Sequence, residues 1–479
     1  MKFSRFYLGC VNDVLKPSWH WAKIKGILFY IFLVTLPLGR RKILAQLTNG
    51  FDEYETIFLY ISDILLVFFL LVSFREIWQF IVARKKEVWF FSLLIFFFAS
   101  IISVGLAALP WLALINLLRL TLLILMAFGV GAGIRSGWIN VRAVFLILIF
   151  LGVFEAVLGF SQFALQKNIG LSFMGEPYLP RLVTSIAPAG VPAGIAKIDL
   201  YGGKLIRAYG TFPHPNILAA FLLLSLTSLF YFWVRNTFKW RVFFYAGVGR
   251  KMSKEFWIYA ARELLLGIGI FMVSLGLLFT FSRAAWLVAM GLFIAFSIFT
   301  FLKRESRRQA VKLFFLCLAV GYILSVNFGV LMASRAHISL KEPAVTYRFR
   351  YNEVAFEIIK NHPLGIGIGN QVIYSVKNQL YQKFDMRALW AWQPVHNIYL
   401  LMASEIGVLG LLAFLSFVFI LVFQVLRNFS LEAITALSLL GVLLLLGLTD
   451  HFLWTLQPGR IMLWLVIGFV LGLNKKTNP

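Results

Sequence analysis

The chain has 479 residues, of which 61% are hydrophobic and 14% are charged, and its mean hydropathy is +0.85. A soluble domain cannot bury that much apolar surface, so the composition excludes a soluble protein and indicates an all-α, polytopic membrane protein. The formal net charge is +25, from 45 Lys and Arg against 20 Asp and Glu. Because no soluble domain is available to bind nucleic acid, we assign this excess to cytoplasmic loops and to contacts with anionic headgroups.

The first 25 residues are basic and aromatic, unlike the charged region and short apolar core of a cleavable signal peptide. We expect residues 1–25 to form a cytoplasmic segment that lies on the membrane interface. Cys10 and Cys317 are far apart and lie in no metal-type spacing, which excludes a disulfide framework and predicts no cysteine metal site.

Apolar runs occur along most of the chain and predict about 12 spans, at about 20 residues per helix. N-terminal transmembrane helices occupy 26–161, a larger transmembrane region with two polar loops occupies 162–473, and 474–479 form a cytoplasmic tail. The expected spans are 26–40, 56–74, 88–107, 111–132, 143–161, 216–234, 257–280, 284–302, 311–331, 397–426, 431–449 and 459–473. We see no internal repeat.

Basic loops between the spans predict the orientation. Since Lys and Arg accumulate on the cytoplasmic side, the loops at 75–86, 135–142, 235–254 and 303–308 mark that side. The cluster Arg40-Arg41-Lys42 falls on the outer side and conflicts with this count, although acidic residues follow it at 52, 53 and 55. The polar loops at 162–215 and 332–396 then lie outside.

The charged residues inside predicted spans include Asp63, Arg119 and Glu155. Such residues are costly in a bilayer unless they are paired or functional. An ion pair of Arg119 with Asp63 or Glu155 is the simpler explanation. The alternative is a polar lining for a substrate cavity, since Glu155, Gly159 and Gln162 share one helix face that leads to the outer loop.

The first outer loop ends in Arg207-Ala-Tyr-Gly-Thr-Phe-Pro-His-Pro-Asn216. The two prolines prevent a helix before Asn216, and we expect Asn216 to cap the helix that follows. Arg207, His214 and Asn216 would then lie at the outer membrane surface. There they either contact a phosphate at the helix N-terminus or, for His214 and Asn216, serve only as a cap.

A third candidate, Arg283, separates two spans with almost no loop, in Thr280-Phe-Ser-Arg-Ala-Ala-Trp286. Its side chain either reaches to lipid headgroups or lines the same cavity as Arg207.

The second outer loop is rich in Lys and Arg. Long loops escape the positive-inside rule, so either an anionic substrate or a solvated surface accounts for this charge. Residues 347–360 have helical spacing, with Val354, Ile358 and Ile359 on the apolar face and Arg348 and Arg350 near the start. We therefore expect the loop to form a mostly helical subdomain. The glycines of Pro363-Leu-Gly-Ile-Gly-Ile-Gly-Asn370 lack the spacing of a nucleotide-binding loop.

His396-Asn397 stands where this loop meets the next apolar run, and Gly407-Val-Leu-Gly410 follows nine residues later. A histidine here places a titratable ring at the membrane surface, beside a loop rich in arginine. The alternative is a polar pair that only caps the next helix.

Three stretches together resemble the O-antigen ligase and O-antigen polymerase family of membrane glycosyltransferases. They are RAYGTFPHPN at 207–216, FTFSRAAWL at 279–287, and the arginine helix with HPLGIGIGN at 362–370 and the His-Asn-x9-Gly-x-x-Gly motif. The resemblance covers most of the chain from about residue 60 onward.

This resemblance implies a reaction and roles for particular residues. A glycan is transferred from undecaprenyl pyrophosphate to an acceptor hydroxyl at the outer face of the cytoplasmic membrane, without a metal or a cofactor. His396 would act as the base, with Arg207 and Arg348 as the other catalytic residues, holding the pyrophosphate. From their positions in the sequence, rather than from the resemblance, we expect Arg283, His214, Asn216, Arg350 and Asn397 to contribute to substrate binding.

The acceptor is not identified by these motifs. A glycolipid, the end of a glycan and a protein hydroxyl correspond to a ligase, a polymerase and a protein O-oligosaccharyltransferase of the same family. A hypothesis of another class is a transporter of lipid-linked glycans, in which His396 would be a structural residue.

Overall fold

The computed structural model describes residues 19–46, 53–179, 195–200, 203–237, 254–336, 342–427 and 430–474. Almost all of the regular structure is helical, and the strands form two short antiparallel hairpins, β1 with β2 and β3 with β4. The elements are α2 (Trp19–Val34), β1 (Arg41–Gln46), β2 (Thr56–Tyr60), α3 (Ile61–Arg84), α4 (Val88–Gly105), α5 (Pro110–Arg135), α6 (Val141–Leu165), η1 (Ser172–Met174), β3 (Lys197–Leu200), β4 (Gly203–Ile206), α7 (Pro215–Arg235), α9 (Lys254–Phe279), α10 (Arg283–Leu302), α11 (Arg307–Ala336), α12 (Pro343–Asn361), α13 (Gln371–Lys377), α14 (Leu380–Lys383), η2 (Leu389–Ala391), α15 (Ile398–Leu426), α16 (Leu431–Leu446), α17 (Phe452–Thr455) and α18 (Gln457–Leu473).

The all-α, polytopic fold class is confirmed. Within the described ranges nine helices are long and apolar enough to cross a membrane, and α16 and α18 are shorter apolar helices. These helices, together with α2, coincide with the twelve apolar runs of the sequence. The 1–25 segment and the tail lie largely outside the described residues, because α2 begins at residue 19 and the described chain ends at residue 474.

The helix predicted to span 56–74 begins later in the structure than expected. Residues 56–60 form strand β2, which pairs with β1, and the helix begins at Ile61. Side chains in β2 alternate between buried and half-buried, as expected for a strand with one covered face. The same hairpin gives Arg41, in the basic cluster Arg40-Arg41-Lys42, its partners. Arg41 Nη1 lies 2.5 Å from Glu53 Oε1, and the guanidinium stacks on the ring of Phe58.

Two helices form the centre of the bundle. α7 and α18 are buried along nearly their whole length, with α7 packed on α6 and α9, and α18 packed on α5. A helix that is apolar on all sides is expected at such a position. Helices at the periphery, such as α10 and α11, expose large apolar side chains, as lipid-facing helices do.

The predicted basic loops meet at one end of the bundle. Arg235, at the end of α7, lies 2.7 Å from Glu432 at the start of α16. Arg84, at the end of α3, donates to the carbonyl of Asn474 after α18 at 3.2 Å. Gln309 in α11 donates to the carbonyl of Asn236. Assignment of this end to the cytoplasm stays a prediction.

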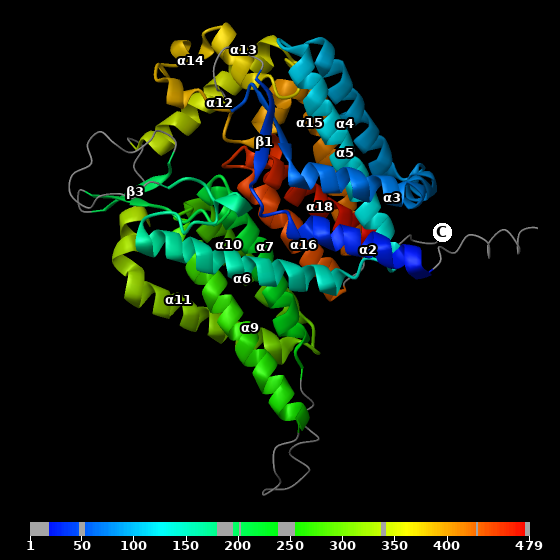
Figure 1. Cartoon of the computed structure of the whole chain (residues 1–479). Coiled ribbons are helices and arrows are strands. Elements are labelled where there is room, and N and C mark those ends of the chain that lie inside the picture. Colours follow the sequence, from blue (N-terminus) through cyan, green and yellow to red (C-terminus); the bar gives the residue numbers. More distant parts are fainter. Residues whose placement is uncertain are drawn as a thin grey trace, which may run out of the picture.

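The second outer loop is helical in its described part, as predicted. α12, α13, α14 and η2 follow α11, and Figure 1 shows α12, α13 and α14 grouped at one side of the molecule. The predicted apolar face of α12 is present, since Val354 and Ile358 are buried. α12 packs against α15, the helix that begins directly after His396.

Candidate functional site

Buried polar side chains of α6 fix the loop that carries Arg207. Glu155 Oε2 accepts a hydrogen bond from the backbone N–H of Thr211 at 2.8 Å, and Gln162 Oε1 accepts from the N–H of Gly210 at 2.8 Å. Gly210 has a φ of 61°, and a Cβ there would lie 2.1 Å from Glu155 Oε2. Glu155 and Gln162 therefore hold the loop in place rather than line a substrate cavity.

Asp63 and Arg119, which the sequence also places inside spans, have partners of their own. Asp63 accepts from the N–H of Tyr60 at 3.1 Å and from the side chain of Gln457, and Arg119 donates to the carbonyl of Phe58. No ion pair joins Arg119 to Asp63 or Glu155 among these described residues. The predicted pairing is therefore wrong, because each charge is satisfied by backbone or amide groups instead.

Arg207 begins a chain of hydrogen bonds that ends at an acidic residue. Its side chain is buried, its Nε donates to the carbonyl of Thr280 at 2.6 Å, and its Nη2 donates to Asn216 Oδ1 at 2.8 Å. Asn216 Nδ2 in turn donates to Asp450 Oδ2 at 2.6 Å. The contacts bring together the loop before α7, the turn between α9 and α10, and the turn between α16 and α17.

His214, not Asn216, is the N-cap of α7. The helix begins at Pro215, and His214 Nδ1 accepts from the N–H of Asn216 at 3.2 Å. A proline at the first helical position sets this start, because its ring fixes φ and its missing N–H is not needed there. The side chain of Asn216 is thereby available to join Arg207 to Asp450.

The glycine-rich segment before α13 docks on a break in α15. Gly365, Gly367 and Gly369 all have positive φ angles, of 90°, 101° and 77°. Gly407 interrupts α15 with φ 81° and ψ 166°, and Val408 N–H donates to the carbonyl of Pro363 at 3.0 Å. The first glycine of the predicted Gly-x-x-Gly motif, Gly407, therefore has a structural role: it breaks α15 where the glycine-rich segment docks.

Glu405, two residues before this break, anchors the same segment. Its carboxylate accepts from the N–H of Gly369 at 2.8 Å, from the N–H of Gln371 at 3.3 Å and from Trp454 Nε1 at 2.7 Å. α13, and the chain that leads from it to His396, are positioned by these contacts.

The proton on the ring of His396 is fixed by its surroundings. His396 Nδ1 lies 2.9 Å from the carbonyl oxygen of Pro394, and because a carbonyl only accepts, Nδ1 carries the proton. The Nε2 of the neutral ring then has the lone pair that can accept a proton. The ring stacks on Tyr351 of α12, with centroids 5.0 Å apart and planes at 7°. Asn397 is the N-cap of α15 and accepts from the N–H groups of Tyr399 and Leu400.

Asp450 and His451, which are not among the candidate residues predicted from the sequence, lie next to His396. The rings of His396 and His451 have centroids 4.8 Å apart at an angle of 81°, and His451 Nδ1 lies 2.7 Å from Thr455 Oγ1. Asp450 Oδ1 accepts from the N–H of His451 at 2.7 Å. A polar Asp-His pair between two apolar runs is a signal in the sequence that could have identified them.

The electrostatic environment keeps the histidines neutral. Burial lowers the pKa of His396 to about 3, His451 and Arg348 lower it further, and Asp450 opposes them. Burial likewise lowers the pKa of His214 to about 4 and that of His451 to about 4. Burial alone would raise the pKa of Asp450, but the three histidines and the hydrogen bond from Asn216 hold it well below its usual range.

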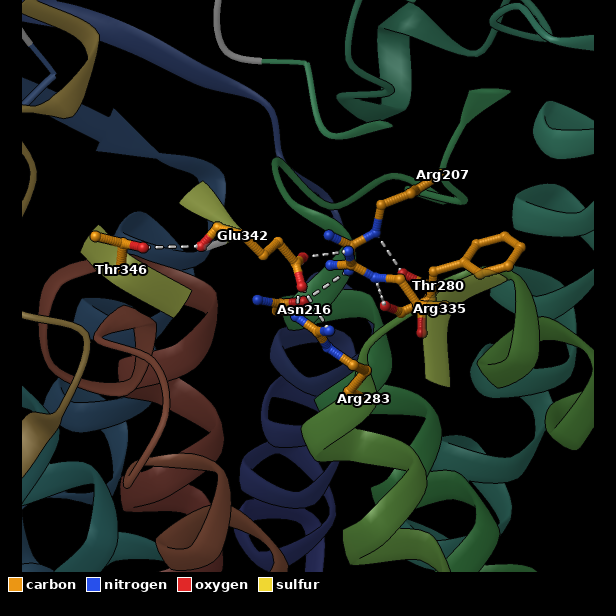
Figure 2. Close-up of polar contacts among 8 residues, drawn as sticks. Arg207, Asn216, Thr280, Arg283, Arg335, Glu342 and Thr346 are labelled. Atoms are coloured by element: carbon orange, nitrogen blue, oxygen red, sulfur yellow. Dashed lines mark hydrogen bonds and ion pairs between the residues drawn. The ribbon is translucent and has the colours of Figure 1, made fainter. Parts of the chain in front are cut away.

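Further arginines surround Arg207. Burial lowers the pKa of Arg207 to about 9, and Arg335 and Arg348 lower it as neighbouring positive charges. Arg283 lies 2.8 Å from Glu342 through Nη1, and Arg335 lies 2.8 Å from the other carboxylate oxygen. Figure 2 shows the Glu342 carboxylate between these two arginines, with Arg207 and Asn216 close by.

Arg350 and Asn397 do not take the substrate-binding positions predicted for them. Arg348 is near His396 and donates through Nε to the carbonyl of Thr449 at 3.4 Å, whereas Arg350 pairs with Asp385 on the surface, at 3.0 Å. Residues two apart on a helix point to different sides, which accounts for this separation. Arg350 therefore lies outside the cluster, and Asn397 serves as a helix cap.

An apolar groove of about 670 Å³ leads away from this cluster, between α10 and α11 and over α7 and α9. Arg283 lies at one end of the groove, and Trp286, Met290, Phe293 and Tyr322 are among the side chains that line it. The groove and the arginines together form a surface with one charged end and a long apolar part. In the part of the chain that the structure describes, no three His, Cys, Asp or Glu side chains are grouped as metal ligands.

Residues 268–415 match the family described as O-antigen ligase, and this segment belongs to that family. The matched segment contains Arg283, Glu342, Arg348 and His396, while Arg207 and Asp450 lie outside it. No curated protein matches the chain.

Proposed function

We propose that the chain transfers a glycan from undecaprenyl pyrophosphate to an acceptor hydroxyl at the outer face of the cytoplasmic membrane, in cell-surface polysaccharide biosynthesis. The observation that carries the proposal is the contact between His396 Nδ1 and the carbonyl of Pro394, beside the arginines around Arg207. It leaves a neutral imidazole nitrogen available as a base, next to groups suited to a leaving phosphate.

The proposed donor fits the two parts of this surface. Guanidinium groups bind phosphate oxygens through paired N–H donors, so Arg207, Arg283 and Arg348 suit a pyrophosphate. The groove that begins at Arg283 is apolar and suits a polyprenyl chain. A soluble nucleotide sugar has no part that would bury against such a groove.

In the proposed step, His396 Nε2 accepts the proton of the acceptor hydroxyl as its oxygen attacks the anomeric carbon of the donor. The bond between that carbon and the pyrophosphate oxygen breaks, and undecaprenyl pyrophosphate leaves with the bonding electrons. The imidazolium later releases its proton to water. Negative charge grows on the departing pyrophosphate, where the arginines stabilise it without a metal or a cofactor.

Donor binding should also raise the basicity of His396, which is low in the protein alone. Its pKa of about 3 reflects burial and nearby positive groups. A bound pyrophosphate adds negative charge close to the ring, which favours the protonated form during transfer. The base is therefore neutral before the reaction and strengthened by its own substrate.

The experiment that tests the proposal uses purified protein, an undecaprenyl-pyrophosphate-linked glycan and a panel of glycolipid, glycan and peptide acceptors. We expect a glycosylated acceptor in one class, and the class that reacts identifies the acceptor. Arg207→Ala should weaken donor binding, measured separately, while Arg350→Ala, a surface arginine, should not. Donor binding without any transfer would favour a transporter and contradict the proposal.

A further inference from the structure

The carboxylate of Glu342 occupies the fork of the Arg283 guanidinium. Arg283 Nη1 lies 2.8 Å from Oε2 and Nη2 lies 3.0 Å from Oε1, so both terminal nitrogens are engaged. Arg335 Nη1 donates to the same Oε1 at 2.8 Å. Figure 2 shows these contacts converging on one carboxylate.

A carboxylate held in this way presents the same pair of oxygens to a guanidinium as a phosphate does. We propose that Glu342 is an internal anion that holds Arg283 and Arg335 before the donor binds and leaves the fork of Arg283 when a pyrophosphate enters. Donor binding is then an exchange of one anion for another. The inference rests on the proposed function, because it takes a lipid-linked pyrophosphate as the incoming ligand.

The remaining donors near Glu342 explain why exchange is needed. Arg335 Nε points to the carbonyl of Phe281 at 3.5 Å, and Arg207 uses Nε and Nη2 on Thr280 and Asn216. A phosphate that binds Arg283 through both terminal nitrogens must therefore take the place of the carboxylate. A carboxylate that stayed beside the phosphate would also repel it.

The position of Glu342 allows it to leave. It is the N-cap of α12, and its side chain is 22% exposed, so water can solvate the released carboxylate. Ion pairs that are partly exposed contribute little to stability, which keeps the exchange reversible. A pyrophosphate carries more charge than one carboxylate and can contact several arginines, whereas a monophosphate competes less well. Glu342 would thus favour pyrophosphate over monophosphate.

The test compares the full-length wild type, Glu342→Gln and Glu357→Gln in detergent. Glu357 lies on the same helix and pairs with Lys383 at the surface, at 2.7 Å, so it controls for loss of a glutamate from α12. The dissociation constants of undecaprenyl pyrophosphate and undecaprenyl monophosphate are measured for each protein, together with the unfolding temperature without ligand.

We expect Glu342→Gln to lower the dissociation constant of undecaprenyl pyrophosphate roughly three- to tenfold, because the arginines no longer have to be vacated. Its preference for pyrophosphate over monophosphate should narrow, its unfolding temperature without ligand should stay close to that of the wild type, and Glu357→Gln should match the wild type in all three measurements. If Glu342→Gln does not fold, Glu342→Asp, which shortens the side chain, should give a smaller gain in affinity.

Unchanged or weaker pyrophosphate binding by the Glu342 variant that folds, when the wild type binds well, would overturn the exchange and leave the proposed function standing. Absence of pyrophosphate binding by the wild type would instead contradict the proposed function itself.

Discussion

The imidazole rings of His396 and His451 meet edge to face, with centroids 4.8 Å apart. One ring precedes α15 and the other precedes α17, and Asp450 is the chain neighbour of the second. A positive charge on either ring disfavours a charge on the other, while Asp450 favours it. The base assigned to His396 therefore belongs to a small electrostatic unit and does not act alone.

Removal of the base should abolish transfer and spare donor binding. We expect His396→Ala to reduce the transfer rate by about 10²- to 10⁴-fold, the usual contribution of a positioned base. The measurement is single-turnover transfer alongside the dissociation constant of the donor. His362→Ala is the control, since His362 contacts Tyr374 at 2.6 Å at the far end of α12. Full activity of His396→Ala would remove His396 from the mechanism.

Neutralising Asp450 should impair the reaction through the histidines. We expect Asp450→Asn to lower the transfer rate about tenfold or more, because the negative charge of Asp450 favours the protonated form of His396 that builds up during transfer. Donor binding should not weaken, because the substitution removes a charge that repels phosphate. Asp385→Asn, a change of a surface partner of Arg350, is the matched control. Equal losses in both variants would speak against this role.

The pH dependence should reveal the lowered pKa of His396. Since the free-enzyme pKa is about 3, the ring stays neutral, and kcat/KM should show no acid limb from His396 between pH 7.5 and about 5. An acid limb centred near 6.5, the ordinary value for histidine, would contradict the environment described above.

Stability must be followed in the same pH series. The folded-state pKa of His396 lies below the unfolded value of about 6.5, so the unfolded chain binds more protons. The contribution of the neutral ring to stability is complete above about 6.5 and is lost progressively as the pH falls from that value towards the folded pKa of about 3. Unfolding temperatures at each pH separate this loss from a true change in rate.

The break in α15 should be intolerant of a side chain. A Cβ at Gly407 would lie 2.7 Å from the carbonyl oxygen of Pro363, and the φ of 81° is unfavourable for other residues. We expect Gly407→Ala to destabilise the fold by about 1–3 kcal/mol, seen as a lower unfolding temperature. Gly291→Ala, where a Cβ meets no atom within 4 Å, should have little effect. Similar unfolding temperatures for the two variants would contradict the strain at Gly407.

The spans and the helix at α12 could be predicted because apolar length and helical spacing are local properties of the sequence. The hairpin β1–β2 was missed, because its strands are short and one continues directly into the apolar run of α3. The sequence analysis predicts the N-cap of α7 at Asn216, two residues late. Proline prevents a helix before it but also favours the first helical position, and α7 begins at Pro215 with His214 as its cap.

The contacts within the site follow tertiary packing, which local patterns do not contain. Arg207 and His396 are candidates from the sequence because polar residues at span ends stand out against apolar runs, and their roles stay predictions. Glu342 and Asp450 were not found, since their importance lies in what they touch: Arg283 for one and Asn216 for the other. The sequence alone does not separate Arg350 from Arg348, two residues before it, but the helix directs Arg350 to Asp385.

The measurement that tests the central claim most directly is glycan transfer by the purified chain in the presence of excess EDTA, with both products quantified. The account predicts that glycosylated acceptor and free undecaprenyl pyrophosphate form in equal amounts, at the same rate with and without the chelator. Loss of transfer with EDTA that added metal restores, or release of undecaprenyl pyrophosphate without a glycosylated acceptor, would contradict it.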